Sequence, residues 1–364
     1  MKKNAPATTH THTNDTMKAM VLDRLAPIET RPLRFAEIKR PQPKKKGELL
    51  IEIEACGVCR SNLHLIEGDW EQYGSPSTLP IVPGHEVVGV VRRKAGGVTA
   101  TTATSVREGD RVGIQPLYSS CLKCEYCMSG KEHLCDSAEI TGESVQGGYA
   151  EYIVADERFV TPIPDSIDSA HAAPLFCPGI TAYKAVLASE PARGRSVGIF
   201  GVGGVGHLAI QIAKMYGSRV VGVSRAKRHL DLAVRLGADN AVAYQESPEQ
   251  FIKSLKKEEG GRLLDSAIVF APSEAAIDAA VKSVKKGGTV VVGVVGNIPS
   301  FSAFEEKTIR GTVIGSRKDM ADLVKLAAEK HLQVVIEEHR LSEANDVLAR
   351  LKKSEVEARA VLVP

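Results

Sequence analysis

Beyond Cys177 the chain alternates between short apolar stretches and stretches of helical length, and this alternation constrains the fold more than any other feature. The strand-like stretches lie at residues 196–200, 219–223, 241–243, 267–270, 289–295 and 311–314, with a last one at 358–363. Helix-like stretches lie at residues 205–216, 228–236, 274–283 and 319–330. Strands that alternate with helices form a parallel, doubly wound sheet. The pattern therefore predicts an α/β fold for this part of the chain.

A glycine-rich turn joins the first of these strands to its helix. Gly201, Gly203 and Gly206 form a GxGxxG pattern, and Gly204 and Val205 belong to the same turn. The first glycine permits the tight turn, the second lets the backbone approach a pyrophosphate, and the third lets helix and strand pack closely. Any tight strand–helix turn can carry such a pattern. Here a further strand follows the helix, so the turn predicts a dinucleotide site at the helix N-terminus.

The end of the next strand bears on which nicotinamide cofactor is bound. NAD enzymes usually place Asp or Glu there to accept a hydrogen bond from the adenine ribose 2′-hydroxyl. This chain instead has Ser224, Arg225, Lys227 and Arg228. A small hydroxyl followed by cations suits a 2′-phosphate, which a carboxylate would repel. We therefore expect NADP(H) in preference to NAD(H), the alternative being the solvated start of a basic helix.

Four cysteines are crowded into one short loop. Cys121, Cys124, Cys127 and Cys135 follow the spacing C-x2-C-x2-C-x7-C. Zinc takes four thiolates in closed structural sites, and such a site fixes a loop that has little core of its own. The segment therefore predicts a structural zinc with no open ligand position.

A second set of metal-binding residues is dispersed along the chain. Cys56 and Cys59 stand close together, His85 is followed by Glu86, and Cys177 comes much later. Two thiolates and one imidazole form a Cys2His set with one open position, which is the composition of a catalytic zinc site. Spacing alone does not decide whether Cys56 or Cys59 is the ligand.

Composition excludes several other classes of protein. In 364 residues, 47 basic side chains oppose 44 acidic ones, which is not the clustered basic excess of a nucleic-acid or membrane-surface protein. The four-cysteine loop mixes acidic and basic residues, so it does not resemble a nucleic-acid-binding zinc module. No apolar run approaches the roughly 18 residues of a membrane helix. We expect a cytoplasmic protein without nucleic-acid or membrane partners, with residues 1–16 as a disordered polar tail.

Together these motifs resemble the zinc-containing medium-chain alcohol dehydrogenases from about Met17 to Pro364. The shared motifs occur in family order: Cys-Arg-Ser-x-x-His, Gly-His-Glu, the four-cysteine loop, Cys-x-Gly-Ile-Thr and Gly-x-Gly-Gly-x-Gly-His. The resemblance implies a GroES-like, mostly β catalytic domain and a Rossmann domain. Its implied boundaries are residues 17–177 and 317–364 for the catalytic domain and 178–316 for the cofactor domain.

The resemblance also implies ligands for the catalytic zinc. Cys59, His85 and Cys177 are the implied ligands, so that Cys56 becomes a small buried apolar residue. Glu86 is implied as a carboxylate that approaches zinc during ligand exchange. One departure is Asn62, where the family usually has an aspartate that supports the zinc histidine. An amide keeps an acceptor but loses the charge, which should make His85 a poorer donor to zinc.

Other site residues follow from the same resemblance. Arg60 is expected at the pyrophosphate, Thr181 at the nicotinamide, and Arg359 facing residue 62 and the cofactor. Ser61 is expected to accept the alcohol proton and pass it through the nicotinamide ribose towards His64, which releases it to solvent. The alternatives are that Ser61 is an ordinary turn residue and His64 an ordinary exposed residue. Trp70, the single tryptophan, is assigned equally to the substrate pocket or to the core.

The predicted function is reversible hydride transfer between a primary alcohol and NAD(P), with aromatic and allylic alcohols as candidate substrates, NADP(H) favoured over NAD(H), and two zinc ions per subunit. The stretch at residues 156–159 and the Ser-x-x-Lys after the second strand resemble the cinnamyl-alcohol branch. The alternatives are a secondary-alcohol or ketone reductase of the same family, a zinc-free quinone reductase of similar fold and a non-catalytic relative. The family further implies a homo-oligomer, either a tetramer or a dimer. The sequence does not identify the alcohol or the physiological direction.

Overall fold

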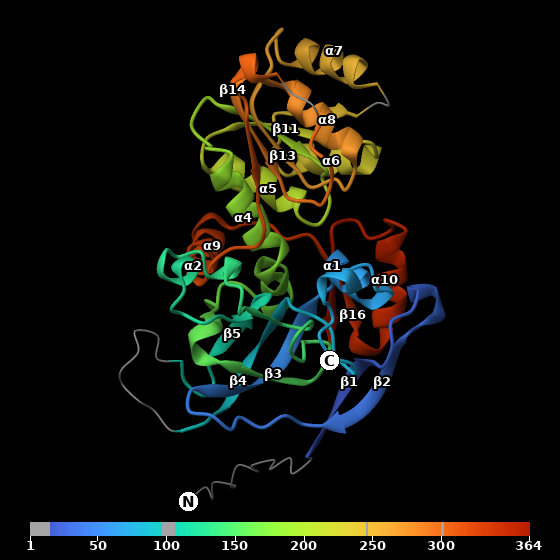
Figure 1. The fold of residues 1–364 in the computed structure, drawn as a ribbon, viewed down its shortest axis with the longest axis vertical. Coiled ribbons are helices and arrows are strands. Elements are labelled where there is room, and N and C mark those ends of the chain that lie inside the picture. The colour runs from blue at the N-terminus through green and yellow to red at the C-terminus, as the bar shows by residue number, and fades with distance from the viewer. Residues whose placement is uncertain (1–14, 97–105, 245–246, 300–301) are drawn as a thin grey trace, which may run out of the picture.

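The computed structural model of the chain describes residues 15–96, 106–244, 247–299 and 302–364. The predicted tail, residues 1–16, falls almost entirely outside the described residues, although strand β1 already begins at Thr16. The molecule is elongated, with a parallel sheet and its helices at one end and a mostly β part at the other (Figure 1). This arrangement confirms the predicted α/β fold of a GroES-like part and a Rossmann part.

The predicted parallel sheet contains six strands in the order β12-β11-β10-β13-β14-β15, all parallel to their neighbours, within the described residues. Their bounds are β10 (Ser196–Phe200), β11 (Arg219–Ser224), β12 (Asn240–Ala243), β13 (Leu264–Val269), β14 (Val284–Val292) and β15 (Thr308–Gly311). The strand predicted at residues 311–314 is wrong, because β15 ends at Gly311 and Ile314 has a φ of 23°, which no strand can contain.

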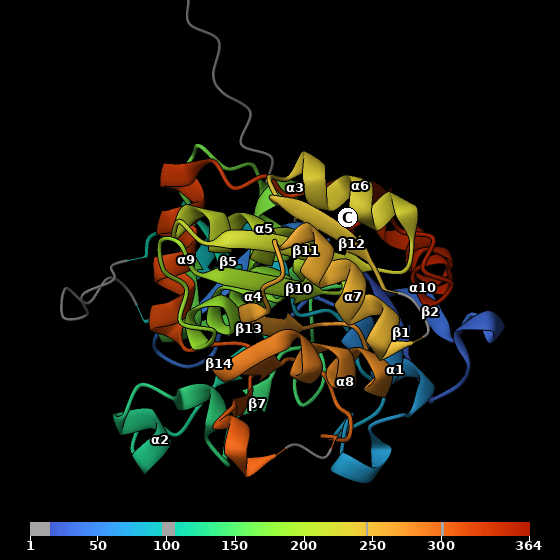
Figure 2. The ribbon, with the colours of Figure 1, turned by 90° about the horizontal axis from the view of Figure 1, so that it is seen from above.

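Helices cover both faces of this sheet (Figure 2). Their bounds are α4 (Pro178–Ala188), α5 (Gly206–Met215), α6 (Lys227–Arg235), α7 (Pro248–Glu258) and α8 (Glu274–Ser283). Apolar side chains of α4, α5 and α6 share one buried cluster with β10, whereas those of α7 and α8 pack in another with β13 and β14. Such burial on both faces explains why the strands are almost continuously apolar.

The second part is built on a seven-stranded sheet in which β3 is central. Its strands are β3 (Glu48–Gly57), β4 (Val87–Lys94), β5 (Arg111–Ile114), β8 (Tyr152–Asp156), β9 (Val160–Pro162), β16 (Ile336–Arg340) and β17 (Arg359–Val363). The last strand, β17, pairs antiparallel with β3, opposing Leu362 to Cys56. The end of the chain thus returns from the parallel sheet to this mostly β part.

Smaller elements complete this part. They are strands β1 (Thr16–Leu22), β2 (Leu33–Lys39), β6 (Leu117–Ser119) and β7 (Glu139–Ile140), and helices α1 (Arg60–Glu67), α2 (Glu125–Met128), α3 (Ser169–Ala172), α9 (Arg317–Lys330) and α10 (Ala344–Lys352). Its short 3-10 turns are η1 (Ile28–Thr30), η2 (Glu71–Tyr73), η3 (Glu132–Leu134), η4 (Glu157–Phe159), η5 (Ala173–Phe176) and η7 (Leu341–Glu343), whereas η6 (Ala303–Glu305) connects β14 to β15 of the parallel sheet.

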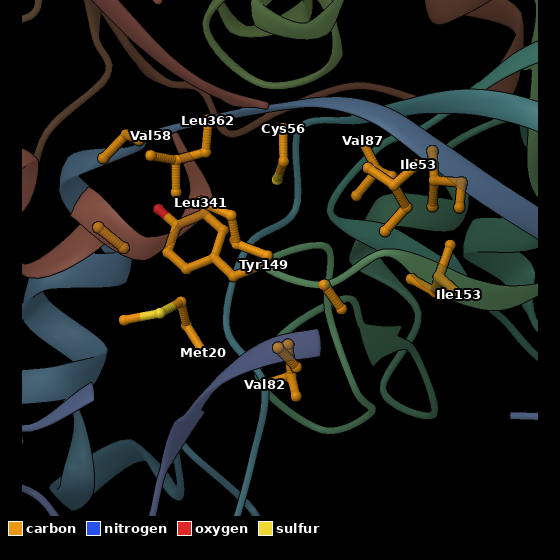
Figure 3. Close-up of a cluster of buried hydrophobic side chains, with 14 of the residues drawn as sticks. Met20, Ile53, Cys56, Val58, Val82, Val87, Tyr149, Ile153, Leu341 and Leu362 are labelled. Atoms are coloured by element: carbon orange, nitrogen blue, oxygen red, sulfur yellow. The ribbon is translucent and has the colours of Figure 1, made fainter. Parts of the chain in front are cut away.

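The core of the β part gathers side chains from distant segments. Figure 3 shows Met20, Cys56, Tyr149, Leu341 and Leu362 in one buried cluster. Because strands from both ends of the sequence meet here, removal of either end would expose the same apolar surface. None of the helices in the described ranges is both long and apolar enough to cross a membrane.

Candidate active site and metal centres

Four candidate ligand residues from three separate segments meet between the two parts of the chain. Cys59 directly precedes α1, His85 and Glu86 precede β4, and Cys177 directly precedes α4, whose first residue is a proline. One ligand atom from each of these four side chains lies within 4.8 Å of every other. The fold therefore assembles the dispersed set that the sequence singled out.

The donor atoms fit a tetrahedral zinc. The sulfur atoms of Cys59 and Cys177 are 3.7 Å apart, and two thiolates on one tetrahedral zinc lie about 3.8 Å apart, given Zn–S bonds of about 2.3 Å. The hydrogen bond from Cys177 lowers the pKa of Cys59 well below its usual range, which favours the thiolate that zinc binds. Glu86 Oε2 belongs to the same set and is buried, with no hydrogen-bond partner among the residues that the structure describes.

The packing distinguishes Cys56 from Cys59 as the candidate metal ligand, a choice that the sequence spacing left open. Cys56 lies in the apolar cluster of Figure 3, with 1% of its surface exposed, and it is not one of the clustered ligand residues. Burial raises the pKa of the Cys56 thiol, which disfavours the thiolate. Cys59 is therefore the residue positioned to bind a metal.

The ring of His85 is held from both sides by residues of α1. Ser61 Oγ lies 3.2 Å from His85 Nε2, and Asn62 Nδ2 lies 3.3 Å from His85 Nδ1. Asn62 Oδ1 accepts hydrogen bonds from the Tyr149 hydroxyl at 3.1 Å and from the Cys59 amide at 3.3 Å. Tyr149 was missed by the sequence analysis because no local pattern links residue 149 to residue 62.

At the far end of α1, His64 faces two residues outside the helix. Its Nδ1 lies 2.7 Å from Asp69 Oδ2, and its ring stacks on Trp70 with centroids 5.4 Å apart. Gly68 ends α1 with a φ of 83° and turns the chain back so that Asp69 and Trp70 meet the last helical turn. Trp70 is thus half-buried beside His64, and Asp69 is a contact that the motifs did not indicate.

Arg359 has a different partner from the one expected. Its guanidinium forms a buried ion pair with Glu86, whereas we expected it to face the neutral Asn62. The pairing of β17 with β3 accounts for this partner. Val361 of β17 lies opposite Gly57 of β3, and the Gly57 amide donates to the Glu86 carbonyl at 2.9 Å. The pairing therefore holds the start of β17, where Arg359 stands, beside Glu86.

Burial raises the pKa of Glu86 to about 7, although the Arg359 guanidinium opposes this effect. The buried carboxyl group therefore loses its proton less readily than the carboxyl of an exposed glutamate does.

The four-cysteine loop forms the second cluster. The ligand atoms of Cys121, Cys124, Cys127 and Cys135 all lie within 4.8 Å of one another. Backbone N–H groups of Lys123 and Cys124 lower the pKa of Cys121 to about 6, and the Cys124 amide lies 3.3 Å from the Cys121 sulfur. Four converging sulfurs with such backbone donors match a closed zinc site.

The loop is anchored to the rest of the protein by an ion pair that the sequence did not reveal. Arg317, at the start of α9, donates through Nε to Glu132 Oε1 at 2.6 Å, and its backbone amide donates to the same oxygen at 2.9 Å.

The glycine-rich turn has the shape expected of a pyrophosphate cradle. Gly201 adopts a φ of 99°, and a Cβ at Gly206 would lie 2.0 Å from the Gly201 carbonyl oxygen, so both positions need glycine. A Cβ at Gly203 would meet no atom of the described residues within 4 Å, so the backbone there is open to a ligand. A Cβ at Gly204 would lie 2.8 Å from Arg359 Nη1, which brings that guanidinium to the turn. Val205 directly precedes α5.

The remaining expected cofactor residues lie near this turn or at the end of β11. Ser224 is the last residue of β11 and contacts His229 at 3.3 Å. Arg225, Lys227 and Arg228 are exposed, and two of them have protein partners, Asp231 for Lys227 and the Ser354 carbonyl for Arg228. Two further residues lie at helix starts: Arg60, exposed in α1, and Thr181, half-buried in the first turn of α4.

Comparison with known proteins agrees with this geometry. Two family models match: the alcohol dehydrogenase GroES-like domain over residues 45–165 and the zinc-binding dehydrogenase over residues 204–329. An alcohol dehydrogenase from Geobacillus stearothermophilus is 40% identical over 352 residues, covering 95% of this chain and 98% of that protein.

Two solved structures are also similar over nearly the whole chain. The alcohol dehydrogenase of Aeropyrum pernix has a TM-score of 0.84 and 32% identity, covering 95% of this chain and 100% of that one. A protein described as a zinc-binding dehydrogenase from Sinorhizobium meliloti, bound to NADP, has a TM-score of 0.83 and 26% identity, covering 96% and 100%.

The fold and the site together define a medium-chain dehydrogenase, with a GroES-like part and a Rossmann part that bring a metal-binding set close to a dinucleotide turn. Within that class, the chain belongs to the zinc-binding alcohol dehydrogenase family. Its reaction is hydride transfer between an alcohol and a nicotinamide cofactor.

Proposed function

We propose that the enzyme is a zinc-dependent, NADP(H)-preferring dehydrogenase of primary alcohols, aromatic or allylic, and that it also reduces the corresponding aldehydes. The observation that carries this proposal is the convergence of Cys59, His85 and Cys177 beside Ser61. A Cys2His set with one open position is the composition of catalytic rather than structural zinc sites.

We assign two zinc ions to each chain. Cys59, His85 and Cys177 would hold the catalytic ion, with Glu86 as the carboxylate that approaches it, whereas Cys121, Cys124, Cys127 and Cys135 would hold the structural one. The catalytic ion would supply Lewis acidity to the alcohol or aldehyde oxygen.

The residues of α1 would handle the proton. Ser61 lies beside His85 and accepts the hydroxyl proton of the alcohol. His64 follows three residues later on the same helix, so the two side chains share one face. The His64 side chain is 37% exposed and can release the proton to water.

The cofactor would lie along the turn from Gly201 to Gly206, with Arg60, Thr181 and Arg359 as further contacts. Support for NADP(H) comes from Ser224 at the end of β11, where no carboxylate stands, and from the exposed Arg225 and Lys227. The NADP bound to the S. meliloti relative is consistent with this preference.

We also propose a homo-oligomer, a tetramer or a dimer, with residues 17–177 and 317–364 as the catalytic domain and 178–316 as the cofactor domain. Large apolar side chains near the edge strand β15 support association with a second copy, because Phe304 is 91% exposed and Val295 is 87% exposed. Light scattering on purified protein would measure the assembly.

The test of the function is reduction of benzaldehyde, cinnamaldehyde and, for the secondary-alcohol alternative, acetophenone. Each is offered with NADPH and with NADH, before and after a strong chelator removes zinc. We expect zinc-dependent oxidation of NADPH with the two aldehydes. Ser224→Asp should favour NADH, because the carboxylate repels the 2′-phosphate. A faster reaction of the unaltered enzyme with NADH would refute the cofactor proposal alone, and activity that survives zinc removal would refute the metal proposal.

A further inference from the structure

His64 is held by two neighbours that lie just beyond α1. Its Nδ1 is 2.7 Å from Asp69 Oδ2. Its ring stacks on the indole of Trp70, with centroids 5.4 Å apart and an angle of 30° between the planes. An imidazole bonded at one nitrogen and stacked on one face has little freedom to rotate, so the direction of its second nitrogen is fixed.

The contact with Asp69 also determines where the proton of neutral His64 lies. An ionised carboxylate only accepts hydrogen bonds, so the neutral ring must carry its proton on Nδ1. Nε2 then keeps its lone pair. A histidine side chain free in water favours the opposite form, with the proton on Nε2, and the partner of one ring nitrogen decides the state of the other.

We propose that Asp69 is a positioning residue for proton transfer: it holds His64 in the form whose Nε2 accepts the proton that alcohol oxidation releases. This inference rests on the proposed function, in which His64 is the last protein group on the proton's route. When Nε2 takes the proton, the ring becomes a cation beside the Asp69 carboxylate. Loss of the proton to water restores the neutral form, and no other reactant is needed.

Three charged residues close to α1 pair with one another. Lys352 of α10 pairs with Glu67 of α1 and Glu29 of η1. In the part of the chain that the structure describes, none of these three forms a hydrogen bond or ion pair with His64. Among the described residues, Asp69 is the charged residue for which a direct contact with His64 is observed, and Arg60, one helical turn before His64, is exposed.

The kinetic test compares Asp69→Asn, His64→Gln and the double variant in the zinc-loaded enzyme. We expect D69N to lower kcat for alcohol oxidation about threefold or more, with KM unchanged, and to cause no further loss in the H64Q background, because contacting residues that act together are non-additive. Asp23→Asn is the matched control, since Asp23 pairs with Arg34 at the surface and is 49% exposed against 54% for Asp69. Equal losses from D69N in both backgrounds would overturn the proposal.

A spectroscopic test separates this inference from the proposed function. In ¹⁵N spectra of histidine-labelled enzyme, with His64 assigned by its loss in H64Q, neutral His64 should carry its proton on Nδ1, and Asp69→Ala, which removes the acceptor, should move it to Nε2. A proton on Nε2 in the unaltered enzyme would refute the role of Asp69. If instead H64Q keeps full activity while the Nδ1 proton is observed, the relay through His64 is wrong although the Asp69 contact is real.

Discussion

Arg359 and Glu86 form an ion pair inside the protein although 273 residues separate them in sequence. The Arg359 side chain is 5% exposed and that of Glu86 is fully buried. The same guanidinium lies against the glycine-rich turn at Gly204. One side chain therefore links the metal-binding cluster, the last strand of the chain and the cofactor turn.

Replacement of this arginine should destabilise the fold. Arg359→Met leaves the Glu86 carboxylate buried without its partner, and breaking a buried pair in this way costs about 3–5 kcal/mol. Urea unfolding of the zinc-loaded enzyme measures the loss. The double variant Glu86→Gln with Arg359→Met should recover part of it, because it buries no unpaired charge. If R359M unfolds at the same urea concentration as the parent, the pair contributes nothing to stability.

Alanine should have different effects at two glycines of the cofactor turn: at one it should weaken cofactor binding, and at the other it should lower stability. A methyl group at Gly203 meets open space, so Gly203→Ala should fold normally but block the approach of the pyrophosphate. We expect NADPH binding to weaken about tenfold or more, which corresponds to about 1.4 kcal/mol. Gly206→Ala is the contrast, because its methyl would collide with the Gly201 carbonyl and should lower the melting temperature. Fluorescence titration with NADPH and thermal melting distinguish the two variants.

The two cysteine clusters should be separable by mutation. Cys127→Ser and Cys59→Ser should each reduce zinc content from two ions to one per chain. C127S should also destabilise its loop, since a structural zinc contributes directly to folding. C59S should lose activity while its melting temperature falls less. Metal analysis, melting curves and aldehyde reduction measure the three effects, and two ions retained in C127S would exclude the predicted structural site.

Asn62 should make the affinity of the catalytic site for zinc lower than an aspartate at the same position would. Asn62→Asp places a carboxylate within reach of His85 Nδ1, where Asn62 Nδ2 now lies at 3.3 Å. A zinc-bound histidine donates its other N–H, and second-sphere partners change metal affinity by roughly 10- to 100-fold. We therefore expect chelator-driven zinc loss from N62D to be at least about tenfold slower. Tyr149→Phe, which removes a donor to Asn62 without adding charge, is the control, and equal release rates in N62D and the parent would contradict the expectation.

Elements bounded by strong local signals were predictable from sequence. The predicted strand at residues 196–200 and the helix at residues 274–283 coincide with β10 and α8. Helix α7 was not predicted, although its Ser247 cap and its Pro248 at the first position are ordinary start signals. The signals that predict each of these elements lie within the element or a few residues from its ends.

Contacts between distant segments could not be predicted in the same way. The metal-binding residues were found because ligand chemistry restricts them to a few residue types. Tyr149 beside Asn62 and Glu86 beside Arg359 depend instead on how β17 and the loop before β8 pack against β3. Even the short-range contact of His64 with Asp69 requires the left-handed turn at Gly68, which a motif does not specify.

His207 should make stability depend on pH below neutrality. Burial lowers the pKa of His207 to about 4, against about 6.5 for an exposed histidine. Between these two values the unfolded chain binds a proton at this residue and the folded protein does not, so stability falls as pH decreases through that window. Over the whole window the contribution is up to about 3 kcal/mol.

The variant His207→Gln removes this titration and can still donate to the Gly203 carbonyl, which lies 3.1 Å from His207 Nδ1. Urea unfolding at several pH values should therefore give a shallower loss of stability for H207Q than for the parent. The exposed His331→Asn is the control, since asparagine tolerates the left-handed backbone there and the change should leave the slope unaltered. Parallel curves for H207Q and the parent would mean that His207 takes up its proton over the same pH range in the folded and unfolded states, and would contradict the lowered pKa.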